Sequence, residues 1–186
     1  MKKKYYLQFI MMATILLISC DQRPTLQSYY VEKMEDSSFL IVNLPFELKD
    51  LFKNDLTPEE TKVIANVEKL NLLIFRLKKG EELKYQRELS QIKSILENKK
   101  YHALMDFEAF DKGQGRLMFE GETDRIKEGI VFLNSTKMGF GVLRILGSDI
   151  NPTALMKLAK KINPNQLKDQ LNSSSLSLGG LFEDVN

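Results

Sequence analysis

The sequence predicts an α+β domain built on a mixed or mostly antiparallel sheet of about six strands, with helices packed on one face of the sheet. Two observations carry this prediction. A long helix with a clear apolar stripe occupies residues 81–98, and four strand candidates separated by glycine-containing turns follow it between residues 101 and 147. Because these strands are consecutive and closely spaced, they are expected to pair as antiparallel meanders.

The first half of the mature chain supplies two buried strands and two helix starts. Residues 38–44 (SFLIVNL) and 70–77 (LNLLIFRL) are short apolar runs rich in strand-forming residues. Pro45 is suited to open a helix, with Asn43 as a nearby cap. The run Thr57-Pro58-Glu59-Glu60 places a threonine cap, a proline at the first helical position and acids in the first turn, so it begins a second helix.

The second half contains the most regular patterns. The apolar stripe of the long helix consists of Tyr85, Leu89, Ile92 and Leu96, which recur at helical spacing. Residues 101–110 alternate between apolar and polar side chains, as in a half-buried strand. Residues 115–121, 129–135 and 139–147 complete the sheet, and Asn151-Pro152 begins a last helix with an apolar inner face.

The N-terminal residues have the parts of an export signal that ends at a cysteine. Met1–Lys4 is basic, and Tyr5–Ser19 is an apolar stretch of 15 residues, shorter than the roughly 20 that span a bilayer. The stretch ends in Leu17-Ile18-Ser19-Cys20, which resembles the lipobox of bacterial lipoproteins. This resemblance implies cleavage before Cys20 and acylation of its thiol and its new amine. An ordinary cleaved signal and an N-terminal membrane helix are the alternatives.

We therefore divide the chain into a signal peptide (1–19), a lipid-anchored tether (20–27), a single α+β domain (28–171) and a flexible tail (172–186). The seven tether residues after the cysteine reach roughly 25 Å at most, so the domain would stay close to its membrane. We expect a cell-envelope protein on the inner or outer membrane that faces the periplasm.

Charge and cysteine content exclude several classes of protein. Loss of Lys2, Lys3 and Lys4 with the signal leaves 24 basic against 25 acidic residues, a net charge of −1. A nearly neutral domain has no electrostatic footprint for nucleic acid, so no nucleic-acid partner is expected, and no cofactor is predicted. Cys20 is the only cysteine, which excludes an intramolecular disulfide.

His102, Asp106 and Glu108 are weak candidate site residues. They are expected to share one face of the strand at 101–110, and an imidazole with two carboxylates could bind a divalent metal. However, residues 102–108 span about 20 Å along a strand, so the three side chains cannot reach one ion. The alternative interpretation is a solvated sheet face. No metal site is predicted.

Other patterns point away from catalysis. Gly113-Gln114-Gly115 is followed by a strand candidate rather than a helix, which indicates a hairpin turn and not a phosphate-binding loop. No serine lies in a G-x-S-x-G elbow, and His102 is the only histidine, so no catalytic residue is assigned. The tail carries the apolar residues Leu176, Leu178, Leu181 and Phe182, which indicate either disorder or a segment that adds to a sheet edge.

Four segments together resemble the bacterial family catalogued as domain of unknown function 4252, short exported proteins of which many are lipoproteins. They are FLIVNLPFELKDLF, LNLLIF, YHALMDFEAF and VLRILGSDINPTALMKL, and the resemblance covers roughly Ser28 to Ile162. It implies export and a compact α+β fold. The family has no assigned activity, so the resemblance implies no catalytic residues.

Three functions remain open from the sequence. The first is a non-catalytic, lipid-anchored module that binds a protein partner in the cell envelope. The second is a carrier of a lipid-like small molecule held between the sheet and its helices, which the abundance of Met, Leu and Phe permits. The third is a hydrolase that uses the surface carboxylates Asp106 and Glu108.

Overall fold

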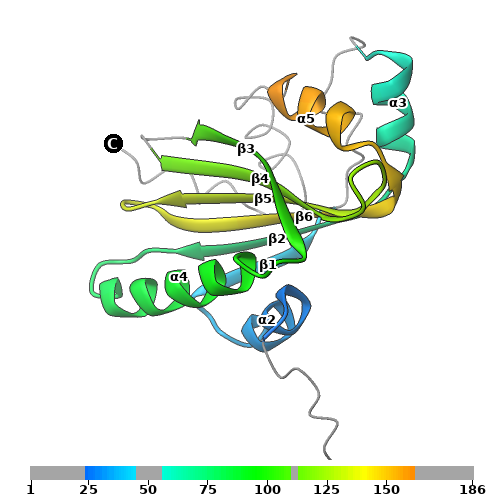
Figure 1. Cartoon of the computed structure of the whole chain (residues 1–186). Helices are drawn as coiled ribbons and strands as arrows, with labels where there is room; N and C mark the ends of the chain where they lie inside the picture. The colour runs from blue at the N-terminus through cyan, green and yellow to red at the C-terminus, as the bar shows by residue number, and fades with distance from the viewer. Residues whose placement is uncertain (1–23, 45–55, 110–112, 162–186) are drawn as a thin grey trace, which may run out of the picture.

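A computed structural model describes residues 24–44, 56–109 and 113–161 of the chain (Figure 1). Four helices and six strands lie in these residues. In chain order they are α2 (Leu26–Lys33), β1 (Phe39–Asn43), α3 (Pro58–Ala65), β2 (Val67–Arg76), α4 (Glu82–Leu96), β3 (Tyr101–Ala109), β4 (Gly113–Gly121), β5 (Ile126–Ser135), β6 (Gly139–Ile150) and α5 (Pro152–Lys161).

The six strands form one open sheet in the order β1-β2-β6-β5-β4-β3, and every neighbouring pair is antiparallel. The α+β prediction is confirmed, and of the two predicted kinds of sheet the structure has the antiparallel one. Strands β3 to β6 follow one another as a meander, as expected from their spacing. Strand β2 then pairs with β6, which joins the first half of the chain to the second.

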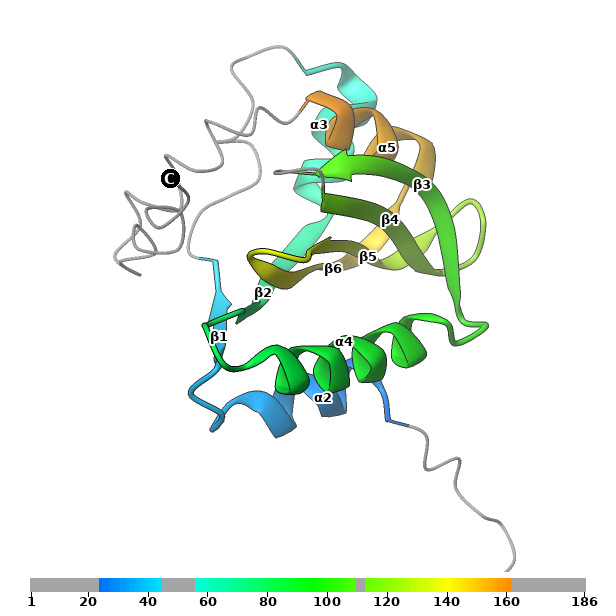
Figure 2. The same ribbon diagram turned by 90° about the vertical axis from the view of Figure 1, so that its left-hand side faces the viewer.

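The prediction that the helices pack on one face of the sheet is wrong. Helices α2 and α4 cover one face, and α3 and α5 cover part of the other (Figure 2). Adjacent residues of β5 show this, because Ile130 and Phe132 belong to the core under α2 and α4, whereas Val131 packs against the core under α3 and α5. A continuous apolar run such as GIVFL is typical of a strand that is covered on both sides.

Aromatic rings dominate the core between the sheet and the α2–α4 layer. Phe75 of β2 and Phe140 of β6 stack with ring centroids 5.4 Å apart, and Phe39 of β1 meets Phe75 edge-on at 5.2 Å. Helix α4 contributes the buried residues of its predicted stripe, with Ile92 completely inaccessible to solvent. This helix was predicted from the same stripe, so the prediction is confirmed to within two residues at each end.

The opposite face is covered by two short helices with capped N-termini. The Thr57 hydroxyl accepts a hydrogen bond from the Glu60 amide, and the Glu60 carboxylate accepts one from the Thr57 amide, which forms a capping box for α3. The Asn151 side chain accepts a hydrogen bond from the Ala154 amide and caps α5. Both helix starts were predicted from sequence and are confirmed.

Ordered structure begins earlier than the sequence indicated. Helix α2 starts at Leu26, inside the predicted tether, and Leu26 is completely buried. A capping box between Thr25 and Ser28 begins this helix, which was not predicted. The expected helix after Pro45, the end of the predicted domain at residues 162–171 and the tail lie outside the described residues. Within those residues, no helix is both long enough and apolar enough to cross a membrane.

Candidate functional site at the β3 edge of the sheet

The longer of the two sheet edges is formed by β3. This strand has nine residues and pairs only with β4 among the described residues, whereas β1 at the opposite edge has five residues. An edge strand presents a row of backbone N–H and C=O groups that can pair with another chain. The edge of β3 also carries all three candidate site residues.

A β-bulge in β3 separates these candidates. Ala103 pairs with Met118 and Met105 pairs with Leu117, so Leu104 is an extra residue without a partner in the ladder. Since side chains alternate along a strand, one extra residue moves every later side chain to the opposite face. His102 therefore lies on the face of α3 and α5, while Asp106 and Glu108 lie on the face of α4. The expectation that the three share a face is wrong.

His102 lies beside an aromatic ring and away from the carboxylates. It pairs across the ladder with Phe119, and the two ring centroids are 5.1 Å apart. Phe119 belongs to the core under α3 and α5. The imidazole thus rests at the exposed border of that core and does not join Asp106 or Glu108 in a site.

Asp106 is held by an arginine on the neighbouring strand. The Arg116 guanidinium donates through Nε to Oδ1 at 2.6 Å and through Nη2 to Oδ2 at 3.2 Å. These hydrogen bonds hold the pKa of Asp106 below its usual value. A carboxylate that stays ionised and occupied on both oxygens is poorly suited to general acid or base chemistry.

A groove of about 550 Å³ adjoins β3 between its C-terminal half, β4 and the C-terminal half of α4. Its lining combines apolar and charged side chains. The lining residues are Lys93, Leu96, Glu97, Asp106, Phe107, Gln114, Gly115, Arg116, Met118 and Phe132. The groove and the free edge are therefore neighbours, and Asp106 and Phe107 belong to both.

Gly115 makes room for an aromatic ring on the face of the sheet that carries α3 and α5. A Cβ atom on Gly115 would lie 2.3 Å from Cε2 of Phe107, the residue opposite it on β3. Gly113 and Gly115 lie within β4, so the prediction that Gly113-Gln114-Gly115 forms a hairpin turn is wrong. Glycine is required here by the close approach of the Phe107 side chain.

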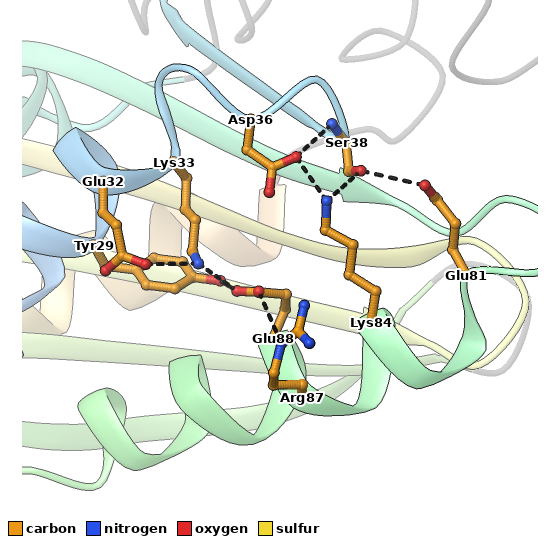
Figure 3. Close-up of polar contacts among 9 residues, drawn as sticks. All are labelled: Tyr29, Glu32, Lys33, Asp36, Ser38, Glu81, Lys84, Arg87 and Glu88. Atoms are coloured by element: carbon orange, nitrogen blue, oxygen red, sulfur yellow. Dashed lines mark hydrogen bonds and ion pairs between the residues drawn. The ribbon is translucent and has the colours of Figure 1, made fainter.

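Sequence reasoning missed a buried charge cluster between α2 and α4 (Figure 3). The Lys33 ammonium lies 2.8 Å from Oε2 of Glu88 and 2.9 Å from Oε1 of Glu32, and the Tyr29 hydroxyl donates to Glu88. Burial, followed by the nearby Glu88 charge, raises the pKa of Tyr29 well above its usual value. The charges along α4 do not indicate this cluster in the sequence, because spacing along one helix cannot reveal a partner on another helix.

A second buried ion pair, between Arg144 and Glu128, helps to hold α2 on the sheet. The Arg144 guanidinium donates to Glu128 at 2.6 Å and to the side chain of Gln27 at 2.6 Å. The Tyr30 hydroxyl donates to the carbonyl of Val142 at 2.7 Å. These contacts join α2 to β5 and β6, so this helix is an integral part of the domain.

A second hollow lies between α3, α5 and the β4–β5 turn. It measures about 490 Å³ and is lined by side chains of both charges: Glu59, Lys62, Val63, Asp124, Asp149, Asn151, Thr153, Ala154 and Lys157. No group of three or more His, Cys, Asp and Glu side chains in residues 24–44, 56–109 and 113–161 is arranged to hold a metal ion.

An open antiparallel sheet with two helices on each face defines a small α+β domain, in which the β3 edge has no neighbouring strand among the described residues and adjoins a groove. The chain belongs to the family described as Domain of unknown function (DUF4252), which matches residues 29–158. The resemblance found in the sequence is thereby confirmed. No curated protein and no solved structure matches the chain.

Proposed function

We propose that this chain is a lipid-anchored protein of the cell envelope that performs no catalysis and binds a protein partner through the free edge of β3. Anchoring would take place at Cys20, which lies outside the described residues. The single observation that carries the binding function is the nine-residue edge of β3, which has a groove beside it.

The sequence around Cys20 supports the anchor. A basic start, an apolar stretch too short to span a bilayer and a Leu-Ile-Ser-Cys end occur together at the spacing of a lipobox. A single myristoyl chain binds a bilayer with K on the order of 10⁴ M⁻¹, so stable attachment needs more than one chain. A cysteine acylated on both thiol and amine would meet that need.

The shape of the β3 edge indicates an extended peptide as the partner's binding element. Residues 105–109, after the bulge, form a regular stretch whose backbone can pair with an added strand. Alternate side chains of that strand would then point toward the groove, where Met118 and Phe132 offer apolar contacts. The exposed carboxylate of Glu108 favours a basic residue in the same segment, since Arg116 already occupies Asp106.

The other two functions have weaker support. The two hollows described above are surface grooves with charged linings, whereas a lipid-like ligand prefers a predominantly apolar cavity. The hydrolase hypothesis depended on carboxylates acting with another group. Asp106 is occupied by Arg116, and His102 lies on the opposite face.

The anchor is tested by labelling cells with a clickable fatty acid. We expect the full chain to carry the label and to fractionate with membranes, and the Cys20→Ser variant to lose both properties. An unlabelled wild-type protein, or one that still begins at Met1, would refute the anchor.

The binding edge is tested with a photo-crosslinking amino acid placed at Glu108 in the membrane-anchored protein. We expect a discrete adduct whose crosslinked peptide maps to an extended, basic segment of one partner. The same probe at Lys160, an exposed position on α5, is the control. If both positions capture the same abundant envelope proteins, or if Glu108 captures none, the proposed binding edge is wrong.

A further inference from the structure

Three large apolar side chains are strongly exposed in the described part of the chain, and all three lie on the same helical layer. Val31 and Met34 belong to α2 and the residue that follows it, with exposed fractions of 57% and 68%, and Leu83 lies in the first turn of α4 with 88%. Single exposed apolar residues are common, but their restriction to one layer points to a common contact.

These residues are not part of an incompletely packed core. The inner ridge of α2 is formed by Leu26, Tyr29, Tyr30 and Lys33, which are all buried. At 100° per residue, Val31 lies on the side of α2 opposite these buried residues, and Met34, which follows the helix, is exposed to solvent rather than packed on the sheet. The buried cluster at Glu88 and Lys33 and the link from Lys84 to Asp36, at 2.7 Å, hold the two helices together beneath this exposed surface (Figure 3).

The length of the tether decides which side of the domain can face the membrane. Six peptide units separate Cys20 from Leu26, so these Cα atoms can be roughly 20 Å apart at most. The domain has three layers, helix, sheet and helix (Figure 2). Since a helix is about 10 Å in diameter and packed layers lie about 10 Å apart, three layers are on the order of 30 Å thick. A tether shorter than that thickness keeps the α2 side close to the bilayer and leaves the α3–α5 side away from it.

We infer that the outer surface of α2 and α4, which carries Val31, Met34 and Leu83, rests on the lipid bilayer in which Cys20 is anchored. This inference rests on the proposed lipidation. The bilayer is the occupant because the tether brings that surface to it without any further partner. The free edge of β3 would then lie at the side of the anchored domain, where a segment from a neighbouring envelope protein can reach it.

Charge plays a small part in this contact. Lys78, Lys79 and Arg87 lie near Leu83 in sequence, and Glu82 and Glu32 are exposed on the same layer. Because the signs nearly balance, the contact should depend on the apolar side chains more than on anionic lipid. It should therefore persist when vesicles of phosphatidylethanolamine and phosphatidylglycerol are replaced by vesicles of phosphatidylcholine.

The test uses the fact that acylation consumes the only cysteine of the chain. The variants Val31→Cys, Met34→Cys and Leu83→Cys are each purified as lipoproteins, labelled with an environment-sensitive fluorophore and inserted into vesicles that contain lipids with nitroxide headgroups. The matched control is Lys160→Cys, an exposed position on α5. We expect about threefold stronger quenching at the three test positions, because interfacial side chains sit within roughly 5–10 Å of the headgroup boundary.

The outcomes separate this inference from the proposed anchor. If the labelled protein does not float with the vesicles, the anchor fails and the inference fails with it. If it floats and all four labels are quenched equally, the anchor stands and the inference is overturned. Labels at positions 31, 34 and 83 that stay accessible to soluble quencher on vesicles but become protected in intact envelopes would overturn it in favour of a protein partner.

Discussion

At the scale of single residues, a few buried polar contacts determine how α2 is held. The side chains of Lys33 and Glu88 are 9% and 4% exposed, and their charged atoms are 2.8 Å apart. Burial alone would lower the pKa of Lys33, but the hydrogen bonds to Glu88 and Glu32 outweigh it and raise that pKa. The ammonium therefore stays charged inside the domain and depends on its carboxylate partners.

Removal of Glu88 should destabilise the protein more than removal of an exposed acid. Glu88→Leu leaves the Lys33 charge with Glu32 alone, so we expect the free energy of unfolding to fall by about 3 kcal/mol, measured by urea denaturation. The double variant Lys33→Met/Glu88→Leu should recover most of this loss, because no uncompensated charge remains. Glu35→Leu, at an exposed position, should change stability by about 0.5 kcal/mol or less. A double variant as unstable as the single would contradict this account.

Alanine substitutions at two glycines with positive φ should distinguish the cost of backbone strain from the cost of a steric clash. Gly80 has φ +89° and open space around its missing side chain, while Gly139 has φ +108° and a Cβ atom there would lie 2.1 Å from the Phe75 carbonyl oxygen. Gly80→Ala should cost roughly 1–2 kcal/mol through strain alone. Gly139→Ala should cost at least about 2 kcal/mol more, or should prevent folding, because the β2–β6 ladder must move. Equal melting temperatures for the two variants would refute the close approach.

Residue-scale detail was the least predictable from sequence. Regular alternation at residues 101–110 placed His102 with Asp106 and Glu108, but the extra residue at Leu104 separates them. A bulge leaves no clear sign in an apolar–polar pattern, because shifting the alternation by one residue still yields a plausible strand. The Lys33–Glu88 pair was hidden for a related reason, since it joins two helices that are far apart in the sequence.

At the scale of elements, an ion pair between Glu60 and Lys161 joins α3 to α5, and the same Glu60 carboxylate takes part in the N-terminal cap of α3. Oε2 of Glu60 accepts hydrogen bonds from the Lys161 ammonium at 2.8 Å and from the Thr57 amide at 2.7 Å. The hydrogen bond from Lys161, followed by that from Thr57, lowers the pKa of Glu60 from its usual value of 4.5. The folded state therefore favours the ionised carboxylate more than the unfolded state does.

This difference predicts a pH dependence of stability. The contribution of Glu60 is fully present above the unfolded pKa near 4.5 and is lost as the pH falls through the lower folded pKa. In Glu60→Gln, the free energy of unfolding should be lower than in the wild type at neutral pH and should fall less steeply on acidification below about pH 5. The exposed Glu59→Gln variant on the same helix should follow the wild type. Parallel wild-type and Glu60→Gln curves would show that the contact does not act in solution.

Elements with a strong periodic pattern or a clear cap were predictable. Helix α4 came from its apolar stripe, α3 and α5 came from their caps, and the meander came from closely spaced strands. Helix α2 was missed because its capping box uses Ser28 in place of an acid, and because the helix has only 8 residues, too few for a clear periodic pattern. Its inner face depends on two tyrosines, which are as common in strands as in helices.

At the scale of the whole molecule, the sheet has a well-covered centre and less protected edges. Strands β5 and β6 have a hydrogen-bonded neighbour on each side and a core on each face, whereas β3 and β1 end the sheet. Cover on both faces could have been expected from the continuous apolar runs in these strands. The order of the strands could not, because closing β2 against β6 depends on a contact between distant parts of the chain.

Amide hydrogen exchange should follow this arrangement. Amides of β6 around Val142 and Ile145 should exchange at a rate set by global unfolding, and those of residues 105–109 should exchange faster through local opening of the edge. Exchange measured by NMR or mass spectrometry on the intact chain checks this order. If residues 105–109 are as protected as β6 in the isolated protein, another part of the chain covers the edge, and β3 is not free for a partner.

The register of β3 also affects how neighbouring copies would behave on a crowded membrane. If residues 105–109 of two copies paired antiparallel about Phe107, Asp106 of each would oppose Glu108 of the other on the same face. Like charges placed directly opposite destabilise a strand pair. Arg116 compensates part of the Asp106 charge, but Glu108 would still meet a carboxylate rather than a cation. This arrangement would disfavour assembly of the domains into continuous ribbons, even at the high local density of a two-dimensional surface, and would leave each edge available to a basic peptide.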